Sequence, residues 1–149
     1  MRLLLQRVSR AEVRVDGAVV GAIGPGLLAL LGVGPDDTPG IARELARRTA
    51  ELRIFADAGG RTNLSVVDVG GEVLAVSQFT LYADTSRGRR PSFIRAGPPE
   101  LARTLFDAFA AGLEALGLTV ARGEFGAKMA VELVNDGPFT IWLDSDAGG

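Results

Sequence analysis

The sequence predicts an α/β fold, in which a single domain over residues 1–149 combines a mixed β-sheet with two principal helices. Strand-like and helix-like segments follow one another along the chain, which is typical of this class. A length of 149 residues fits one domain, and a hydrophobic content of 47% supports a substantial core. The chain contains no internal repeat, low-complexity tract or interdomain linker that would divide it.

The first part of the chain has the patterns of β-strands. Val13 and Val15 alternate with Glu12 and Arg14, the period of a half-solvated strand. Asp16-Gly17 is typical of a hairpin turn, because glycine reaches the positive φ that such turns require. The uninterrupted apolar run at 27–33 suits a strand that is covered on both faces. The strands expected here are 3–8, 12–15, 19–23 and 27–33, with a turn at 24–26.

Two segments have the start signals and the periodicity of helices. Thr38 predicts a helix cap with Pro39 in the first turn, and this helix runs to about Leu52. Its apolar side is marked by Ile41, Leu45 and Leu52. The second helix runs from Pro99 or Glu100 to about Leu116, with one apolar face made of Leu101, Leu105, Phe106, Phe109 and Leu113.

The remaining segments are shorter or less regular. They predict a strand at 54–55, a loop at 57–60, a hairpin turn at Gly70-Gly71, strands at 72–77, 119–122, 127–134 and 138–143, and a frayed tail at 144–149. Residues 82–99 form a long irregular stretch. Because loops of this length inside a compact domain are usually functional or disordered, it is a candidate for function.

The chain contains no histidine and no cysteine. It therefore has no disulfide and no thiolate zinc site, and the usual base of a serine esterase is missing. No nucleotide-binding glycine fingerprint or metal-ligand spacing is present, so we expect no metal and no other cofactor. The N-terminal residues do not resemble a signal peptide, and the longest apolar run, 26–33, is too short to span a bilayer. We expect a cytoplasmic protein without a membrane partner.

Two short polar segments are candidates for a catalytic site. The residues of 77–80, Ser-Gln-Phe-Thr, place hydroxyl and amide groups directly after an apolar run. Backbone N–H groups and hydroxyls aimed at a developing oxyanion lower a barrier by roughly 3–4 kcal/mol per donor. Alternatively, Ser77 and Thr80 satisfy only the hydrogen bonds of a strand end. Similarly, Gly137-Pro138 is either a turn between two strands or a rigid peptide used as a wedge.

Basic residues gather in the irregular stretch. Between Asp84 and Glu100 the chain has no acid and four arginines, which are Arg87, Arg89, Arg90 and Arg95. Such a cluster can contact phosphate or ribose, although the arginine bias of a GC-rich genome also explains it. The net charge of −2 argues against a general nucleic-acid binder.

Several motifs occur together in the order and spacing of one known family. They are Arg7-Val8-Ser9-Arg10-Ala11, Asn63-Leu64-Ser65, Asp68-Val69-Gly70-Gly71, residues 77–84, residues 88–93, Phe125-Gly126-Ala127-Lys128-Met129 and Asn135-Asp136-Gly137-Pro138. With these motifs the chain resembles the D-aminoacyl-tRNA deacylases of the bacterial and eukaryotic type, also called the D-tyrosyl-tRNA(Tyr) deacylase family. The resemblance covers nearly the whole chain.

The resemblance implies a barrel-like sheet, a homodimer, and hydrolysis of the ester between a D-amino acid and the terminal adenosine of tRNA. No cofactor is implied, and aminoacyl-tRNA is the expected partner. Ser77, Gln78, Phe79 and Thr80 would line the pocket, with the Phe79 amide close to the substrate carbonyl. Much of the catalysis would fall to the ribose 2′-hydroxyl of the tRNA, which agrees with the missing histidine. Glycyl-tRNA should also be accepted, because glycine has no side chain to clash.

The resemblance also implies how L-aminoacyl-tRNA is rejected. The Gly137-Pro138 peptide, cis in this family, would enter the pocket of the partner subunit and exclude an L side chain. A rigid block of this kind costs the wrong enantiomer more than added attraction for the right one would gain. Arg7 would fix this peptide across the interface, with Thr140 in a supporting position. The residues that would bind adenosine and the rest of the tRNA are Phe125, Met129, Arg87, Arg89 and Arg90.

Two residues depart from the family pattern, Phe139 where valine is common and Gly97 where alanine is common. Phe139 is expected to change only the packing, and Gly97 to loosen the loop beside the pocket. A second functional hypothesis remains, a non-catalytic dimeric RNA-binding module that would use the arginine cluster with Phe93 as a stacking residue.

Overall fold

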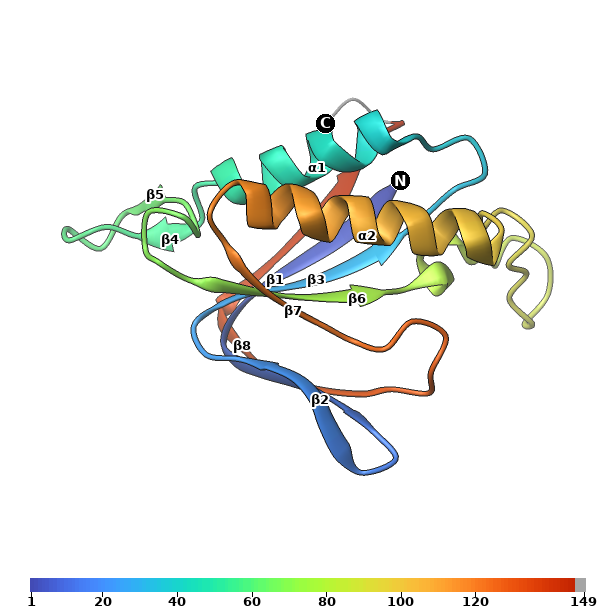
Figure 1. The fold of residues 1–149 in the computed structure, drawn as a ribbon, viewed down its shortest axis with the longest axis horizontal. Helices are drawn as coiled ribbons and strands as arrows, with labels where there is room; N and C mark the ends of the chain where they lie inside the picture. Colours follow the sequence, from blue (N-terminus) through green and yellow to red (C-terminus); the bar gives the residue numbers. More distant parts are fainter. Residues whose placement is uncertain (147–149) are drawn as a thin grey trace.

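The computed structural model describes residues 1–146, in which two helices lie across one face of a curved, mixed β-sheet (Figure 1). The strands are β1 (Arg2–Val15), β2 (Ala18–Ile23), β3 (Gly26–Gly32), β4 (Phe55–Ala56), β5 (Thr62–Leu64), β6 (Glu72–Ser77), β7 (Thr119–Arg122) and β8 (Ala130–Asp144). The helices are α1 (Pro39–Glu51), α2 (Pro99–Ala115) and one 3₁₀ turn, η1 (Phe79–Tyr82). The predicted α/β class is confirmed.

The main sheet combines antiparallel and parallel pairing. Its order is β2-β1-β3-β6-β7, and β8 pairs with β1 outside this path. β1 is antiparallel to β2, β3 and β8, whereas β6 lies parallel to β3 and to β7. Parallel neighbours need a long crossover, and the connections from β3 to β6 and from β6 to β7 carry α1 and α2. The two helices therefore cover the face on which these crossovers run.

The two ends of the sheet order approach each other, so that the sheet nearly closes into a barrel. A Cβ atom at Gly21 of β2 would lie only 2.7 Å from the carbonyl oxygen of Arg122 on β7. Only glycine allows two backbones to come this close. This confirms the barrel-like sheet.

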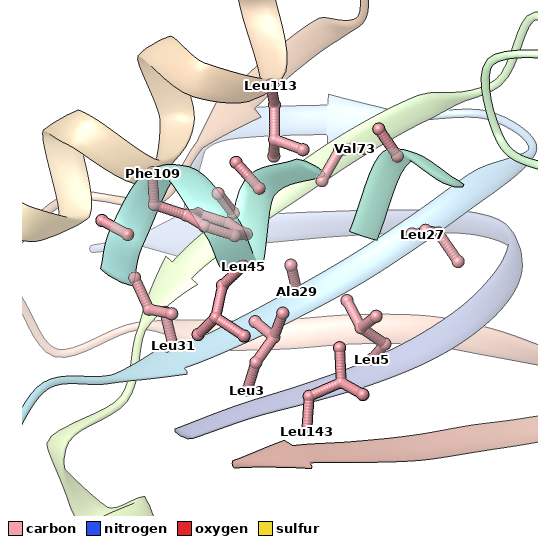
Figure 2. Packing of buried hydrophobic residues seen from close by; sticks show 14 of the residues in the cluster. Leu3, Leu5, Leu27, Ala29, Leu31, Leu45, Val73, Phe109, Leu113 and Leu143 are labelled. Carbon is pink, nitrogen blue, oxygen red and sulfur yellow. The ribbon is translucent and has the colours of Figure 1, made fainter. Parts of the chain in front are cut away.

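The main core fills the space between the helices and the sheet (Figure 2). Leu45 of α1 and Phe109 of α2 point toward Leu3, Ala29 and Leu31 of the strands, and all five are buried. A second cluster lies on the other face of the sheet and includes Val8, Val13, Leu28, Leu74 and Val76. β3 contributes to both clusters, which explains its uninterrupted apolar sequence.

The predicted start of α1 is confirmed, but its buried face differs from the expected one. The Thr38 hydroxyl accepts a hydrogen bond from the Ile41 amide at 3.3 Å, and Pro39 is the first helical residue. Ile41 and Leu52 are only partly buried. The buried face consists mainly of small residues and comprises Ala42, Leu45, Ala46, Thr49 and Ala50. Small residues allow α2 to pack closely, since a Cβ atom at Gly112 would lie 2.9 Å from the Ala46 Cβ.

Three predicted boundaries are wrong because they depend on pairing between distant strands. The segments 3–8 and 12–15 belong to one strand, β1. The segments predicted at 127–134 and 138–143 belong to one strand, β8, which begins only at Ala130. The two long strands pair with each other past two irregularities. Gly70-Gly71 is not a hairpin turn, because β6 pairs only with the parallel strands β3 and β7. The Asp16-Gly17 hairpin is confirmed, with φ of 50° and 79°.

Part of the predicted frayed tail, 144–146, is held by contacts with the rest of the chain. Asp144 is the last residue of β8 and pairs with Arg2, and the Ser145 amide donates to the Met1 carbonyl at 2.9 Å. The rest of that prediction, 147–149, lies outside the described residues. Within 1–146, neither helix has the length and apolar character needed to cross a bilayer.

Candidate active site

A cavity of about 500 Å³ opens where β6 ends, where α2 begins and where β7 connects to β8. Its lining is formed by Val76, Ser77, Gln78, Phe79, Ala96, Gly97, Pro99, Ala102, Phe125, Gly126, Ala127, Met129 and Val131. None of these described residues is ionisable. Ligand pockets for small molecules have volumes of about 300–1,000 Å³, so the cavity can hold a nucleoside-sized group.

The turn after β6 begins with backbone N–H groups that have no partner within the turn. The Gln78 amide continues the sheet pairing by donating to the Leu31 carbonyl at 2.7 Å, and the chain then enters η1. The first N–H groups of a helical turn have no partner within the turn, and Gln78 provides no side-chain cap. The Phe79 amide is therefore available to donate to a bound group.

The predicted polar residues 77–80 come together at this turn. Ser77, Gln78 and Phe79 line the cavity. Thr80 is exposed and lies outside the lining, but its hydroxyl accepts a hydrogen bond from the Gln78 side-chain amide. The alternative, in which these groups satisfy only a strand end, accounts less well for three consecutive residues that face a cavity.

The opposite wall comes from the connection between β7 and β8. Phe125 and Met129 both line it, and Gly126 between them adopts a φ of 77°. The guanidinium of Arg103 on α2 lies 4.6 Å from the centre of the Phe125 ring. Arg103 was not among the predicted site residues, and the sequence marks it only as one residue of the second helix; in the structure it follows the cavity residue Ala102.

Gly97 anchors the neighbouring loop tightly, which contradicts the expectation that it loosens this loop. Its amide donates to the Val33 carbonyl at 2.8 Å. A Cβ atom on Gly97 would lie 2.9 Å from the carbonyl oxygen of Gly34. Glycine is therefore needed here for a close approach of two backbones.

The Gly137-Pro138 segment is a bulge in β8 that side chains hold in place. Its peptide bond is cis, and Gly137 has a φ of 122°. Asn135 spans the bulge, because its side-chain amide donates to the carbonyls of Arg7 and Phe139, both at 2.9 Å. Its Oδ1 accepts from the Thr140 hydroxyl at 3.3 Å.

Arg7 holds the same bulge from the neighbouring strand, within its own chain. Its Nε donates to the Asp136 carbonyl at 3.2 Å, and its Nη1 donates to the Ile54 carbonyl at 2.5 Å. The guanidinium also lies 4.4 Å from the centre of the Phe139 ring, which packs against the core. Arg7 therefore contacts the residues on either side of Gly137-Pro138 within its own chain, whereas the expected contact was across a subunit interface.

The bulge and the cavity lie at different places on the sheet. Arg7, which faces the bulge, pairs with Leu27 on β3, whereas Ser77 pairs with Leu31, four residues further along that strand. This offset is about 13 Å along the strands, and three strand spacings add about 14 Å across them. Gly137-Pro138 does not line the cavity of its own chain.

The arginine-rich loop lies beside the cavity rather than inside it. Arg87, Arg89 and Arg90 are exposed, and of these only Arg87 lines a second hollow of about 380 Å³. Arg95 in that hollow lies 3.6 Å from the Asp84 carboxylate. The hydroxyl and the amide of Ser86 hold the pKa of this carboxyl below its usual value.

Exposed aromatic rings connect the loop with the cavity. Phe79 and Phe93 make an edge-to-face contact with ring centres 5.1 Å apart, and 55% of Phe79 is exposed. An exposed aromatic pair at the mouth of a pocket marks a surface that binds a partner or a ligand.

A chain without histidine or cysteine has no imidazole- or thiol-based nucleophile. The structure is that of a small α/β protein with a cavity at the end of β6, lined by polar and apolar residues and by no ionisable side chain among those described. The chain belongs to the D-Tyr-tRNA(Tyr) deacylase family, whose sequence model matches residues 4–144.

Relatives with high sequence identity are D-aminoacyl-tRNA deacylases. The chain is 63% identical over 145 residues to the D-aminoacyl-tRNA deacylase of Roseiflexus castenholzii, which covers 97% of this chain and 92% of the relative. It is 59% identical over 144 residues to that of Deinococcus deserti, with 97% and 99% covered. The chain is therefore a hydrolase of ester bonds that deacylates D-aminoacyl-tRNA. This finding removes the hypothesis of a non-catalytic RNA-binding module.

Solved structures have the same fold. A c-Myc DNA unwinding element binding protein superposes with a TM-score of 0.90 at 39% identity, covering 97% of this chain and 98% of the other. A probable eukaryotic D-amino acid tRNA deacylase gives a TM-score of 0.84 at 17% identity, with 95% and 97% covered. At this lower identity the likeness concerns the fold alone.

Proposed function

We propose that this deacylase works as a homodimer in which the Gly137-Pro138 bulge of each subunit enters the cavity of the other. The observation that carries this proposal is the separation of the two segments within one chain. The bulge is exposed and held rigidly, but it lies roughly 20 Å from the cavity end of its own sheet. A second copy can bring it there without any change of fold, and the exposed Phe79 and Phe93 rings offer an apolar surface for that copy.

Chiral selection follows from the rigidity of this bulge. The bulge would face the Cα of the bound amino acid on the side where an L side chain projects. Arg7 and Asn135 hold the carbonyl groups of the two flanking residues, Asp136 and Phe139, so the bulge cannot move aside at low cost. Rejection of L substrates is then steric, whereas D side chains point away from the bulge.

The cavity residues have separate roles in this proposal. The Phe79 amide donates to the ester carbonyl and stabilises the oxyanion that develops there, and Ser77, Gln78 and Thr80 complete the polar wall. Phe125 and Met129 hold the terminal adenine by apolar contact. The exposed Arg87, Arg89 and Arg90 contact phosphates further along the tRNA, which makes affinity dependent on salt.

The position of the bulge beside the Cα of the bound amino acid sets the substrate range. Glycyl-tRNA and D-alanyl-tRNA are expected to be hydrolysed at similar rates, and L-alanyl-tRNA at least about 100-fold more slowly, because only the L methyl group meets the bulge. The measurement is kcat/KM for the three esters on one and the same tRNA, which serves as its own control for RNA contacts. Equal rates for D- and L-alanyl-tRNA would contradict steric selection, and a resistant glycyl ester would show that the enzyme needs a D side chain.

Ser77 is not the nucleophile in this proposal. Ser77→Ala is expected to lower kcat by less than about tenfold, since it removes one hydrogen-bonding group while water still attacks the ester. Single-turnover deacylation of D-aminoacyl-tRNA measures this, and Thr104→Ala, at an exposed residue of α2 outside the cavity, is the control. An acyl group trapped on Ser77, detected by mass spectrometry, would disprove a direct attack by water.

We also propose that residues 1–149 form one domain and act in the cytoplasm. The buried residues of the main core come from β1, β3, β6, α1, α2 and β8, so the described chain does not divide into parts with separate main cores. The absence of cysteine suits a reducing compartment.

A further inference from the structure

Arg103 lies on α2 beside the cavity, with its charge directed over the Phe125 ring. The guanidinium carbon is 4.6 Å from the ring centre, and the residue is exposed. Among residues 1–146 it forms no ion pair, whereas Asp107, one turn further along α2, is paired with Arg122 at 3.2 Å. A positive charge that no described carboxylate neutralises therefore stands at the rim of the cavity.

Within residues 1–146, the Arg103 guanidinium contacts the Phe125 ring and makes no hydrogen bond. A guanidinium that stacks on an aromatic ring uses its flat face, and its N–H groups point outward in the plane. Stacking also restricts the side chain before any ligand arrives, so less entropy is lost on binding. This arrangement suits a planar, two-point contact with phosphate oxygens.

We propose that Arg103 binds the phosphate that joins the terminal adenosine of the tRNA to the nucleotide before it. The inference rests on the proposed function, which places that adenosine against Phe125 and Met129. The 5′-phosphate is the anionic group closest to the base and ribose held there. Adenine occupies the cavity side of Phe125, and the guanidinium covers the outer face of the same ring.

Arg103 differs in this respect from the arginine-rich loop. Arg87, Arg89 and Arg90 lie on a loop outside the cavity and can contact phosphates at any position that reaches them. Arg103 lies against the ring of Phe125, which lines the cavity. It can therefore contact only the last phosphate of the tRNA.

The test compares two ligands that differ only in this phosphate. They are a non-hydrolysable 3′-D-tyrosylamido adenosine and the same compound with a 5′-phosphate, and their Kd values are measured by calorimetry. The wild-type protein is expected to bind the phosphorylated compound about fivefold to tenfold more tightly, as one charge-assisted contact at a partly exposed site allows. Arg103→Gln is expected to remove this difference while leaving the Kd of the unphosphorylated compound unchanged.

Two control variants show whether the phosphate effect belongs to Arg103. Arg43→Gln removes one exposed positive charge from α1 and is expected to keep the full difference. Phe125→Ala is expected to weaken the binding of both compounds; if it changes neither Kd, the proposed adenosine position fails.

A phosphate effect that is absent in the wild type, or that persists in Arg103→Gln, overturns the role of Arg103 while the proposed position of the adenosine stands. An equal loss for both compounds in Arg103→Gln also overturns it, since Arg103 would then act only by supporting Phe125.

Discussion

Gly137→Ala is expected to lower the preference for D- over L-aminoacyl-tRNA by about 100-fold, the equivalent of about 2.8 kcal/mol. Gly137 has a φ of 122°, a conformation that alanine rarely adopts. A Cβ atom at this position would lie 2.7 Å from Nη2 of Arg7 and 3.0 Å from the Phe139 ring. The bulge must therefore move and lose part of its contact with Arg7. The measurement is kcat/KM for D- and L-aminoacyl esters on the same tRNA.

Gly17→Ala is the matched control for the backbone effect. Gly17 also has a left-handed conformation, with a φ of 79°, but a Cβ atom there would meet no atom within 4 Å. This variant shares the conformational cost and lies in the β1–β2 hairpin, so its enantiomer preference should equal that of the wild type. If Gly137→Ala keeps the full preference while remaining folded by circular dichroism, the bulge does not select chirality.

Mixed dimers distinguish a bulge that acts on the partner from one that acts on its own chain. Ala96→Trp is expected to fill the cavity and inactivate that subunit, while its bulge stays intact. When these subunits are mixed with Gly137→Ala subunits, heterodimers regain one complete site, made of the open cavity of one chain and the intact bulge of the other. Selective deacylation should return after mixing. No recovery, with heterodimers verified by native mass spectrometry, would contradict a cross-subunit site.

Replacement of the terminal ribose 2′-hydroxyl by hydrogen is expected to reduce kcat by about 10³-fold, within the range attributed to general acid–base catalysis. No described residue that lines the cavity is ionisable, so the protein offers no base to the attacking water there. The neighbouring 2′-hydroxyl is the polar group of the substrate closest to the ester. Rapid-quench measurement of D-aminoacyl-tRNA with a 3′-terminal 2′-deoxyadenosine gives this rate.

The same substitution at the preceding cytidine provides the control. It removes a hydroxyl of the same kind, one nucleotide away from the ester, and should leave kcat within about twofold of the unmodified substrate, as expected for a group outside the reacting centre. If the terminal 2′-deoxy substrate is hydrolysed at the full rate, a protein group must activate the water, and Thr80 and Ser77 would be examined first.

Local signals in the sequence predicted much of the fold. Thr38 and Pro39 start α1, and Asp16-Gly17 turns β1 into β2, because each depends on a few neighbouring residues. The alternation around Val13 and the apolar run of β3 likewise reflect burial on one face or on two. The sequence failed at Gly70-Gly71, since a glycine turn looks the same whether the following strand pairs with the preceding one or with distant strands.

The candidate site was predicted in part. Of the residues that the motifs marked, Ser77, Gln78, Phe79, Phe125 and Met129 line one cavity, whereas Thr80 lies outside its lining. Arg103 was missed because an exposed arginine on a helix has no distinctive local pattern. The role of Gly97 was misjudged for a related reason. Its close contact with Gly34 brings together two loops that are far apart in the sequence.

The sequence by itself determined the kind of chemistry, because a chain without histidine and cysteine excludes imidazole and thiol catalysis wherever its residues lie. It also determined the helices and most of the strands, whose propensities and caps are local. Only the tertiary structure decided that β6 lies between two parallel strands, that its end opens onto a cavity, and that Gly137-Pro138 lies far from that cavity in its own chain. These features depend on pairing between segments that are far apart in the sequence, and short-range patterns do not specify which distant strands pair.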